Sequence, residues 1–157
     1  MATQTYQVYI KATAQAIWDG LTTAERTKAY GYRCPVAYDL APGGAFRTFP
    51  TDEMRAMGSA DTIIEGEVLE VDAPRRLVQT WHARFDETTS AEAVTRLSLE
   101  LEDTSEGVVK LTLTHELDGA PVTAALVSGA MPNTGGGWSF VLSDLKTLLE
   151  TGTALNG

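Results

Sequence analysis

Two histidines, one cysteine and a few strand carboxylates are the side chains of this sequence that could carry acid–base or nucleophilic chemistry. His82 directly follows the bulky Trp81, so strand alternation places the two on opposite faces. His115 is in phase with Leu111 and Leu113, which places it on the buried face. Two histidines on opposite faces of a sheet cannot bind one ion, so we predict no metal site.

The other reactive side chains have no partners nearby in the sequence. Glu67 could act as a general base in a cyclase- or hydrolase-like enzyme, but no second acid or nucleophile accompanies it. Cys34 lies before Pro35 and beside Arg33, with no histidine near it, and we expect a chemically quiet thiol that packs as a small apolar group. The sequence therefore predicts no catalytic residue and no cofactor, and an acid–base enzyme stays an alternative.

Composition narrows the classes of partner. The chain has 157 residues and a formal net charge of -9, which disfavours nucleic acid and anionic membrane surfaces. A single cysteine, no signal-peptide pattern and no apolar run of membrane-spanning length predict a cytoplasmic protein without membrane insertion. We expect residues 1–157 to form a single domain.

The elements that must position these side chains are organised around a C-terminal helix. Its apolar residues follow helical spacing, while Ser143 and Asp144 fall on the polar face. Asn133 or Thr134 could cap its start, and Gly152 could end it in a left-handed conformation. The apolar stripe consists of Trp138, Val141, Leu142, Leu145, Leu148 and Leu149.

Strand-like alternation fills the middle of the chain. Two short helices follow the first strand, one over 14–21 and one starting at a capping box of Thr22 and Glu25. Residues 50–60 are expected to form a loop, and the strand charges at Arg47, Glu67, Arg84 and Arg96 to face solvent. The predicted strands are 6–10, 36–40, 45–49, 62–71, 76–85, 91–102 and 108–117.

This order of elements predicts an α+β fold. The economical packing is a curved antiparallel sheet of about seven strands wrapped around the long C-terminal helix. A bent sheet around one helix leaves a gap, which suits an apolar ligand. We predict that the ligand-binding residues are Trp81, His115, Trp138, Phe46, Tyr30, Tyr32, Leu97, Leu113 and Val141.

Several short stretches have a distinctive order along the chain. They are Ala16-Ile17-Trp18, Leu21-Thr22, Pro42-Gly43-Gly44-Ala45-Phe46, Gly66–Val71, Pro74–Trp81, Val109–His115 and Gly137-Trp138. In that order they resemble the START-like superfamily, also called SRPBCC, and most closely its branch related to the activator of the heat-shock-protein-90 ATPase. The resemblance implies a helix-grip fold. It implies no single activity, because the superfamily includes lipid carriers, polyketide binders, cyclases and co-chaperones.

Three functional hypotheses follow. The leading one is a binding domain for a hydrophobic or aromatic small molecule, with His115 as a polar point in the wall of the gap. The second is the acid–base enzyme based on His115 or Glu67. The third, a chaperone-associated interaction module with a chaperone partner, rests on the resemblance.

Overall fold

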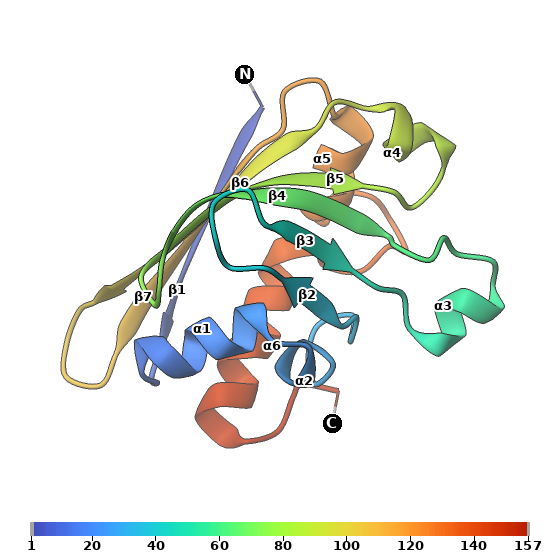
Figure 1. Ribbon diagram of the computed structural model, residues 1–157. Coiled ribbons are helices and arrows are strands. Elements are labelled where there is room, and N and C mark those ends of the chain that lie inside the picture. Colours follow the sequence, from blue (N-terminus) through green and yellow to red (C-terminus); the bar gives the residue numbers. More distant parts are fainter. Residues whose placement is uncertain (1, 157) are drawn as a thin grey trace.

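A seven-stranded antiparallel sheet arches over one long helix in the computed structural model, which describes residues 2–156 (Figure 1). The strand order is β1-β7-β6-β5-β4-β3-β2. The strands are β1 (Thr3–Ile10), β2 (Val36–Tyr38), β3 (Ala45–Thr48), β4 (Ile64–Asp72), β5 (Arg76–Ala83), β6 (Thr95–Asp103) and β7 (Val109–Glu116). The helices are α1 (Ala14–Thr22), α2 (Ala24–Thr27), α3 (Asp52–Ala56), α4 (Glu87–Ala91), α5 (Pro121–Val127) and α6 (Gly137–Thr151). The predicted α+β, helix-grip architecture is confirmed.

Alternation of apolar and polar side chains produces the sheet. On β6, Leu97 and Leu99 are buried on the α6 side, whereas Arg96 and Glu100 lie exposed on the outer face. The neighbouring strand β7 is in register, with Leu99 opposite Leu113, so both strands present one continuous apolar surface. No helix among residues 2–156 is long and apolar enough to cross a membrane.

The first helices differ from the prediction in one cap. Thr13 caps α1, because its hydroxyl accepts a hydrogen bond from the backbone N–H of Ala16 at 3.0 Å. The predicted capping box of Thr22 and Glu25 is wrong. Thr22 is the last residue of α1, and its hydroxyl donates back to the carbonyl of Trp18 at 2.8 Å, so α2 begins one residue later without a side-chain cap.

Two short helices lie where the sequence predicted other structure. α3 occupies the expected loop 50–60, and the hydroxyl of Thr51 caps it by accepting from the N–H of Met54. α4 lies between the predicted strands 76–85 and 91–102, where Asp86 and Thr89 form a reciprocal capping box. Because α4 extends to Ala91, strand β6 begins only at Thr95. Both helices are set by their caps and are too short for apolar periodicity to reveal them.

Helix α6 begins later than predicted and ends as predicted. Neither Asn133 nor Thr134 caps it, since the helix starts at Gly137 with Gly136 as N-cap residue. The N–H of Gly137 donates instead to the hydroxyl of Tyr32 at 3.1 Å. A side chain at Gly137 would collide with the carbonyl of Val127, so this start requires glycine. The helix ends at Gly152 in the left-handed conformation, with φ of 86°.

Asp144 is the residue of α6 whose surroundings differ most from the sequence prediction. The helical pattern placed it on the polar face, but its side chain is only 1% exposed. One carboxylate oxygen accepts the N–H of Gly31 and the other accepts the N–H of Leu155, each at 2.7 Å. The α2–β2 loop and the C-terminal tail therefore fold onto this face of α6, and two charge-assisted hydrogen bonds offset the burial of the carboxylate.

Candidate functional site

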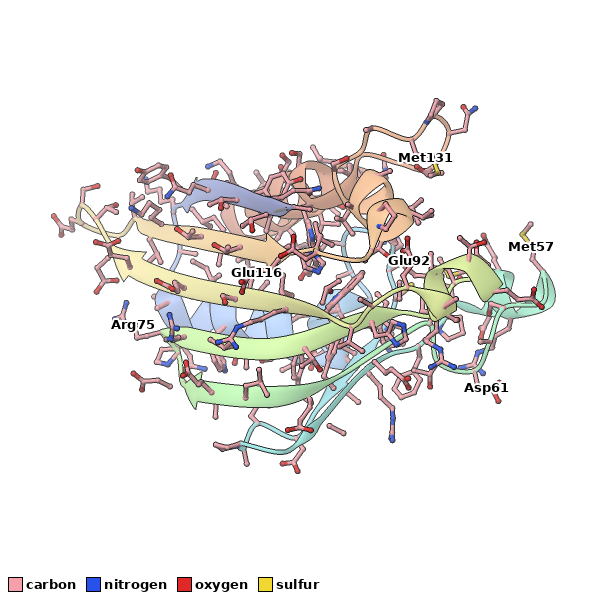
Figure 2. All side chains as sticks on the ribbon, turned by 90° about the horizontal axis from the view of Figure 1, so that it is seen from above. Met57, Asp61, Arg75, Glu92, Glu116 and Met131 are labelled. Atoms are coloured by element: carbon pink, nitrogen blue, oxygen red, sulfur yellow. The ribbon has the colours of Figure 1, made fainter. Side chains whose placement is uncertain are left out.

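A cavity of about 570 Å³ lies between the concave face of the sheet and the first half of α6. Residues of α3, of the β5–α4 connection and of the α5–α6 loop line it at one end, including Met54, Phe85 and Met131. Figure 2 shows Met57 of the α3 region and Met131 at the same end of the molecule, with Arg75 of the β4–β5 turn at the opposite end. We call the end with α3 and Met131 the mouth.

Eight of the nine residues predicted from the sequence line this cavity. They are Trp81, Trp138, Phe46, Tyr30, Tyr32, Leu97, Leu113 and Val141. They come from four strands, one helix and one loop, and they meet because the inner faces of the strands and the apolar stripe of α6 converge there. The size and the predominantly apolar lining are typical of small-molecule pockets.

His115, the ninth residue, lies behind the wall. Its side chain is fully buried and does not line the cavity, so His115 does not form the predicted polar point in the wall. The rings of Trp81 and Trp138 cover it, with ring centroids 5.0 Å and 6.0 Å from that of His115. The alternation of side chains along the strand correctly predicted that His115 faces α6. It could not predict that two large neighbouring rings cover the imidazole.

A chain of directed hydrogen bonds passes through His115. The indole N–H of Trp138 donates to Nδ1 of His115 at 3.1 Å. Because an indole can only donate, Nδ1 carries no proton, so the neutral ring is protonated on Nε2. Nε2 lies 2.8 Å from the hydroxyl of Thr95, which in turn donates to the carbonyl of Trp81 at 2.6 Å. The chain fixes Trp138 against the sheet and directs its only polar atom away from the cavity.

Burial determines the charge of His115. Desolvation lowers the pKa of His115 from 6.5 to about 4, so the imidazole is neutral near pH 7. With both ring nitrogens committed and no access to the cavity, His115 is suited to position Trp138. It has no open position from which to exchange a proton with a ligand.

Other polar groups of the inner wall are also committed to internal partners. The hydroxyl of Tyr30 donates to the carbonyl of Gly20 at 2.7 Å, and that of Tyr38 donates to Gln79 at 2.6 Å. Burial raises the pKa of both tyrosines, so both are neutral. Tyr38 also packs against Phe46, with ring centroids 4.7 Å apart. The inner wall therefore offers mainly ring faces and aliphatic groups to a ligand.

The mouth also holds residues that the sequence pattern did not reveal. Cys34 and Met54 meet there, with their sulfur atoms 3.7 Å apart, and burial raises the pKa of the Cys34 thiol. The ring of Tyr32 packs on Phe140 at a centroid distance of 5.7 Å. Thr51 is a good N-cap residue, and recognising it would have predicted the short helix that carries Met54.

The outer face of the sheet carries the other candidate groups. His82 lies opposite in direction to Trp81, as predicted, beside a shallow groove of about 270 Å³ lined also by Glu65 and Glu67. The Nε2 atom of His82 is buried without a hydrogen-bond partner among the described residues. Glu67 is exposed, and Glu65 pairs with Arg84 at 2.9 Å. Among residues 2–156, no three His, Cys, Asp or Glu side chains cluster closely enough to hold a metal ion.

The geometry separates the two proposed acid–base groups. Glu67 lies on the outer face, whereas His115 is enclosed on the inner side. Glu67 is exposed, and both ring nitrogens of His115 bind groups inside the protein, so we propose no acid–base reaction for either residue.

Comparison with known proteins gives one family match. The model of the family described as "Activator of Hsp90 ATPase homolog 1-like protein" matches residues 11–150. No curated protein matches the chain in sequence.

Solved structures share the fold at low sequence identity. One is PFC0360w, described as an HSP90 activator from Plasmodium falciparum, with 19% identity and a TM-score of 0.66 over 96% of this chain and 97% of that one. Another is the Aha1 dimer from Colwellia psychrerythraea, with 19% identity and a TM-score of 0.67 over 97% and 98%. A third is CalU16 from Micromonospora echinospora, with 17% identity and a TM-score of 0.66 over 96% and 77%. At these identities the likeness establishes the fold.

Proposed function

The chain belongs to the family of Activator of Hsp90 ATPase homolog 1-like proteins, and we propose that it binds a hydrophobic or aromatic small molecule between the sheet and α6. The family and fold support a ligand-binding or Hsp90-activator-like domain in general. The observation that favours a ligand is the cavity of about 570 Å³, since close-packed interiors hold few voids larger than a water molecule.

The wall chemistry defines the class of ligand. Trp81 and Trp138 lie with ring centroids 6.0 Å apart, and both line the cavity. Their faces suit flat or aliphatic groups. The hydrogen bond to His115 holds the ring of Trp138, and the ring of Trp81 packs against that of His115. A wall held in place before binding lowers the entropy cost of ordering on association.

Thermal unfolding in the presence of a panel of hydrophobic and aromatic compounds tests this proposal. A ligand that binds only the folded state stabilises it by about 2.7 kcal/mol at one hundred times its Kd. Val141→Trp should abolish the stabilisation, because Val141 lines the cavity and an indole would occupy it. Leu126→Trp, on α5, is a second cavity-filling variant should the first fold poorly.

Ser139→Trp is the matched control. It places the same side chain on the same helix, but Ser139 is exposed and lies outside the cavity lining. The control should keep the response to ligand that Val141→Trp loses. Equal responses in the two variants, or no stabilising compound in the panel, would contradict binding in this cavity.

A second candidate, stimulation of an Hsp90-type ATPase, is favoured by the family match and by the name of the Plasmodium falciparum structure. Its test is the ATPase rate of the Hsp90 from the same organism with and without this protein. An unchanged rate and no co-purification would contradict the chaperone role. Repeating the assay with Val141→Trp separates the two candidates, because a surface interaction does not require an open cavity.

A further inference from the structure

Charge is scarce around the cavity. Among residues 2–156, Arg33 and Asp86 are the only charged residues that line it, and both lie at the mouth. Every other lining residue is neutral, so any charge on a ligand has to be matched by one of these two. A neutral donor on the wall, such as the Trp81 indole N–H, could not offset the desolvation of an anion deep in the cavity.

Asp86 is already committed to a structural role. Its carboxylate accepts hydrogen bonds from the backbone N–H of Thr89 at 2.8 Å and from the Thr89 hydroxyl at 3.0 Å, which caps α4. The bonds from Thr89 lower the pKa of Asp86, so it is ionised while it caps α4. Asp86 is exposed, so a ligand cation could still reach it, and a cationic probe distinguishes that case from binding of an anion at Arg33.

Arg33 has no such commitment. It forms no ion pair or side-chain hydrogen bond with any of the described residues, although the chain carries a net charge of -9. Asp52 and Glu53, the acidic residues at the start of α3, are not among the lining residues. The guanidinium at the mouth is therefore available to an anion from outside the protein.

The backbone at Arg33 is strained. Its φ is 63°, in the left-handed region that costs a non-glycine residue roughly 1–2 kcal/mol. The N–H of Arg33 donates to the carbonyl of Tyr30 at 3.0 Å, which holds this turn. A glycine would satisfy the same turn without strain, and strained residues of this kind cluster where proteins clamp ligands.

We propose that the ligand is an amphipathic anion, a hydrophobic monocarboxylate whose carboxylate pairs with Arg33 at the mouth while its apolar body lies against Trp81 and Trp138. This inference rests on the proposed small-molecule function and adds the charge and orientation of the ligand. Arginine presents two parallel N–H donors to a carboxylate, and its partly exposed position avoids the full cost of burying an ion pair.

Three probes that share one alkyl chain test the inference: decanoate, decanol and decylamine, titrated by calorimetry near neutral pH. Decanoate should bind best. Arg33→Gln should weaken decanoate binding about tenfold, as expected for one charge-assisted hydrogen-bonded pair, and should change decanol binding less than about twofold. Arg33→Lys should restore part of the loss, because it keeps the charge and loses the paired donors.

Lys28→Gln is the matched control, since it removes one positive charge from the same region without touching the cavity. It should leave decanoate binding unchanged. Equal affinity for decanoate and decanol, or an equal effect of the Lys28 and Arg33 variants, would overturn the role of Arg33 and leave the proposed binding function intact. Preference for decylamine would overturn it in favour of Asp86. No binding of any probe would contradict both the inference and the binding function for alkyl ligands.

Discussion

The two halves of helix α6 face different surroundings, although both carry the same apolar stripe. In the first half, Trp138 and Val141 are half-buried and line the cavity. In the second half, Leu145 is fully buried and packs against α1 at Gly20, where even a Cβ would lie 2.9 Å from the leucine methyl group. One end of the molecule is therefore packed densely, and the other is left open.

Different forces hold the two halves. Dense apolar contact fixes the second half, whereas the first half depends on placed hydrogen bonds, from Trp138 to His115 and from Gly137 to Tyr32. A side chain that borders a cavity contacts other protein atoms on one side only, so packing alone holds it less firmly than a side chain of the core. The comparison shows how polar groups that point away from a cavity can fix an apolar wall.

Leu145→Ala should have the largest effect on stability. Removing a fully buried leucine from the packed end should lower the free energy of unfolding by about 2–5 kcal/mol, because it leaves a new cavity. Val141→Ala, at the open end, should cost less than about 1 kcal/mol, since it only widens an existing cavity. Urea unfolding of both variants measures the difference. Equal losses would show that the two ends are packed alike.

His115 should make stability depend on pH. The unfolded histidine takes up a proton near pH 6.5, whereas the folded one does so only near pH 4. Between these values the unfolded state binds more protons, so stability should rise with pH across the window and fall as the solution is acidified. The full difference is on the order of 3 kcal/mol.

His115→Gln should remove this part of the pH dependence, and His82→Gln is the control that should retain it. The measurement is urea unfolding at several pH values between 4 and 6.5. Carboxylates titrate in the same range, so the test compares slopes between variants. A slope in His115→Gln equal to that of the wild type would show that the imidazole is not shielded as the structure indicates.

Asp144→Asn tests the junction between the two halves. An amide has one oxygen, so it can accept from the N–H of Gly31 or of Leu155 but cannot satisfy both as the carboxylate does. An unsatisfied buried N–H should lower the free energy of unfolding by about 1–3 kcal/mol. Ser143→Asn, at the exposed neighbouring position, should cost almost nothing. Equal stability of the two variants would contradict the anchoring role of Asp144.

Much of the fold could be predicted from sequence because its long elements carry a regular period. Alternation in β6 and β7 and the helical stripe of α6 reflect the burial of one face, which is a local property of the sequence. Asp144 could not be predicted in this way. It lies at a polar position of its helix, and Gly31, far away in sequence, is one of the two groups that bury it. Only the tertiary structure brings that loop to the helix.

The candidate site was predictable to the same extent. Strand alternation placed Leu97 and Leu113 on the inner surface, and helical spacing placed Val141 there. All three line the cavity. Phase could not show that Trp81 and Trp138 close over His115, because that depends on side-chain size across neighbouring strands. Nor could it place Arg33 at the mouth, since loop residues follow no period.

The smallest effect, and the one most specific to the open end, is expected at Cys34. Burial raises the pKa of its thiol, and its sulfur contacts that of Met54, so a thiol reagent near neutral pH should label Cys34 more slowly than a free model thiol. Labelling needs only local opening of the mouth, which costs less free energy than global unfolding.

Leu145→Ala, at the packed end, should therefore leave the labelling rate of Cys34 unchanged. If labelling instead required global unfolding, every 1.4 kcal/mol lost by Leu145→Ala would accelerate it about tenfold. Acceleration of that size would show that the two ends open together and would remove the distinction between them.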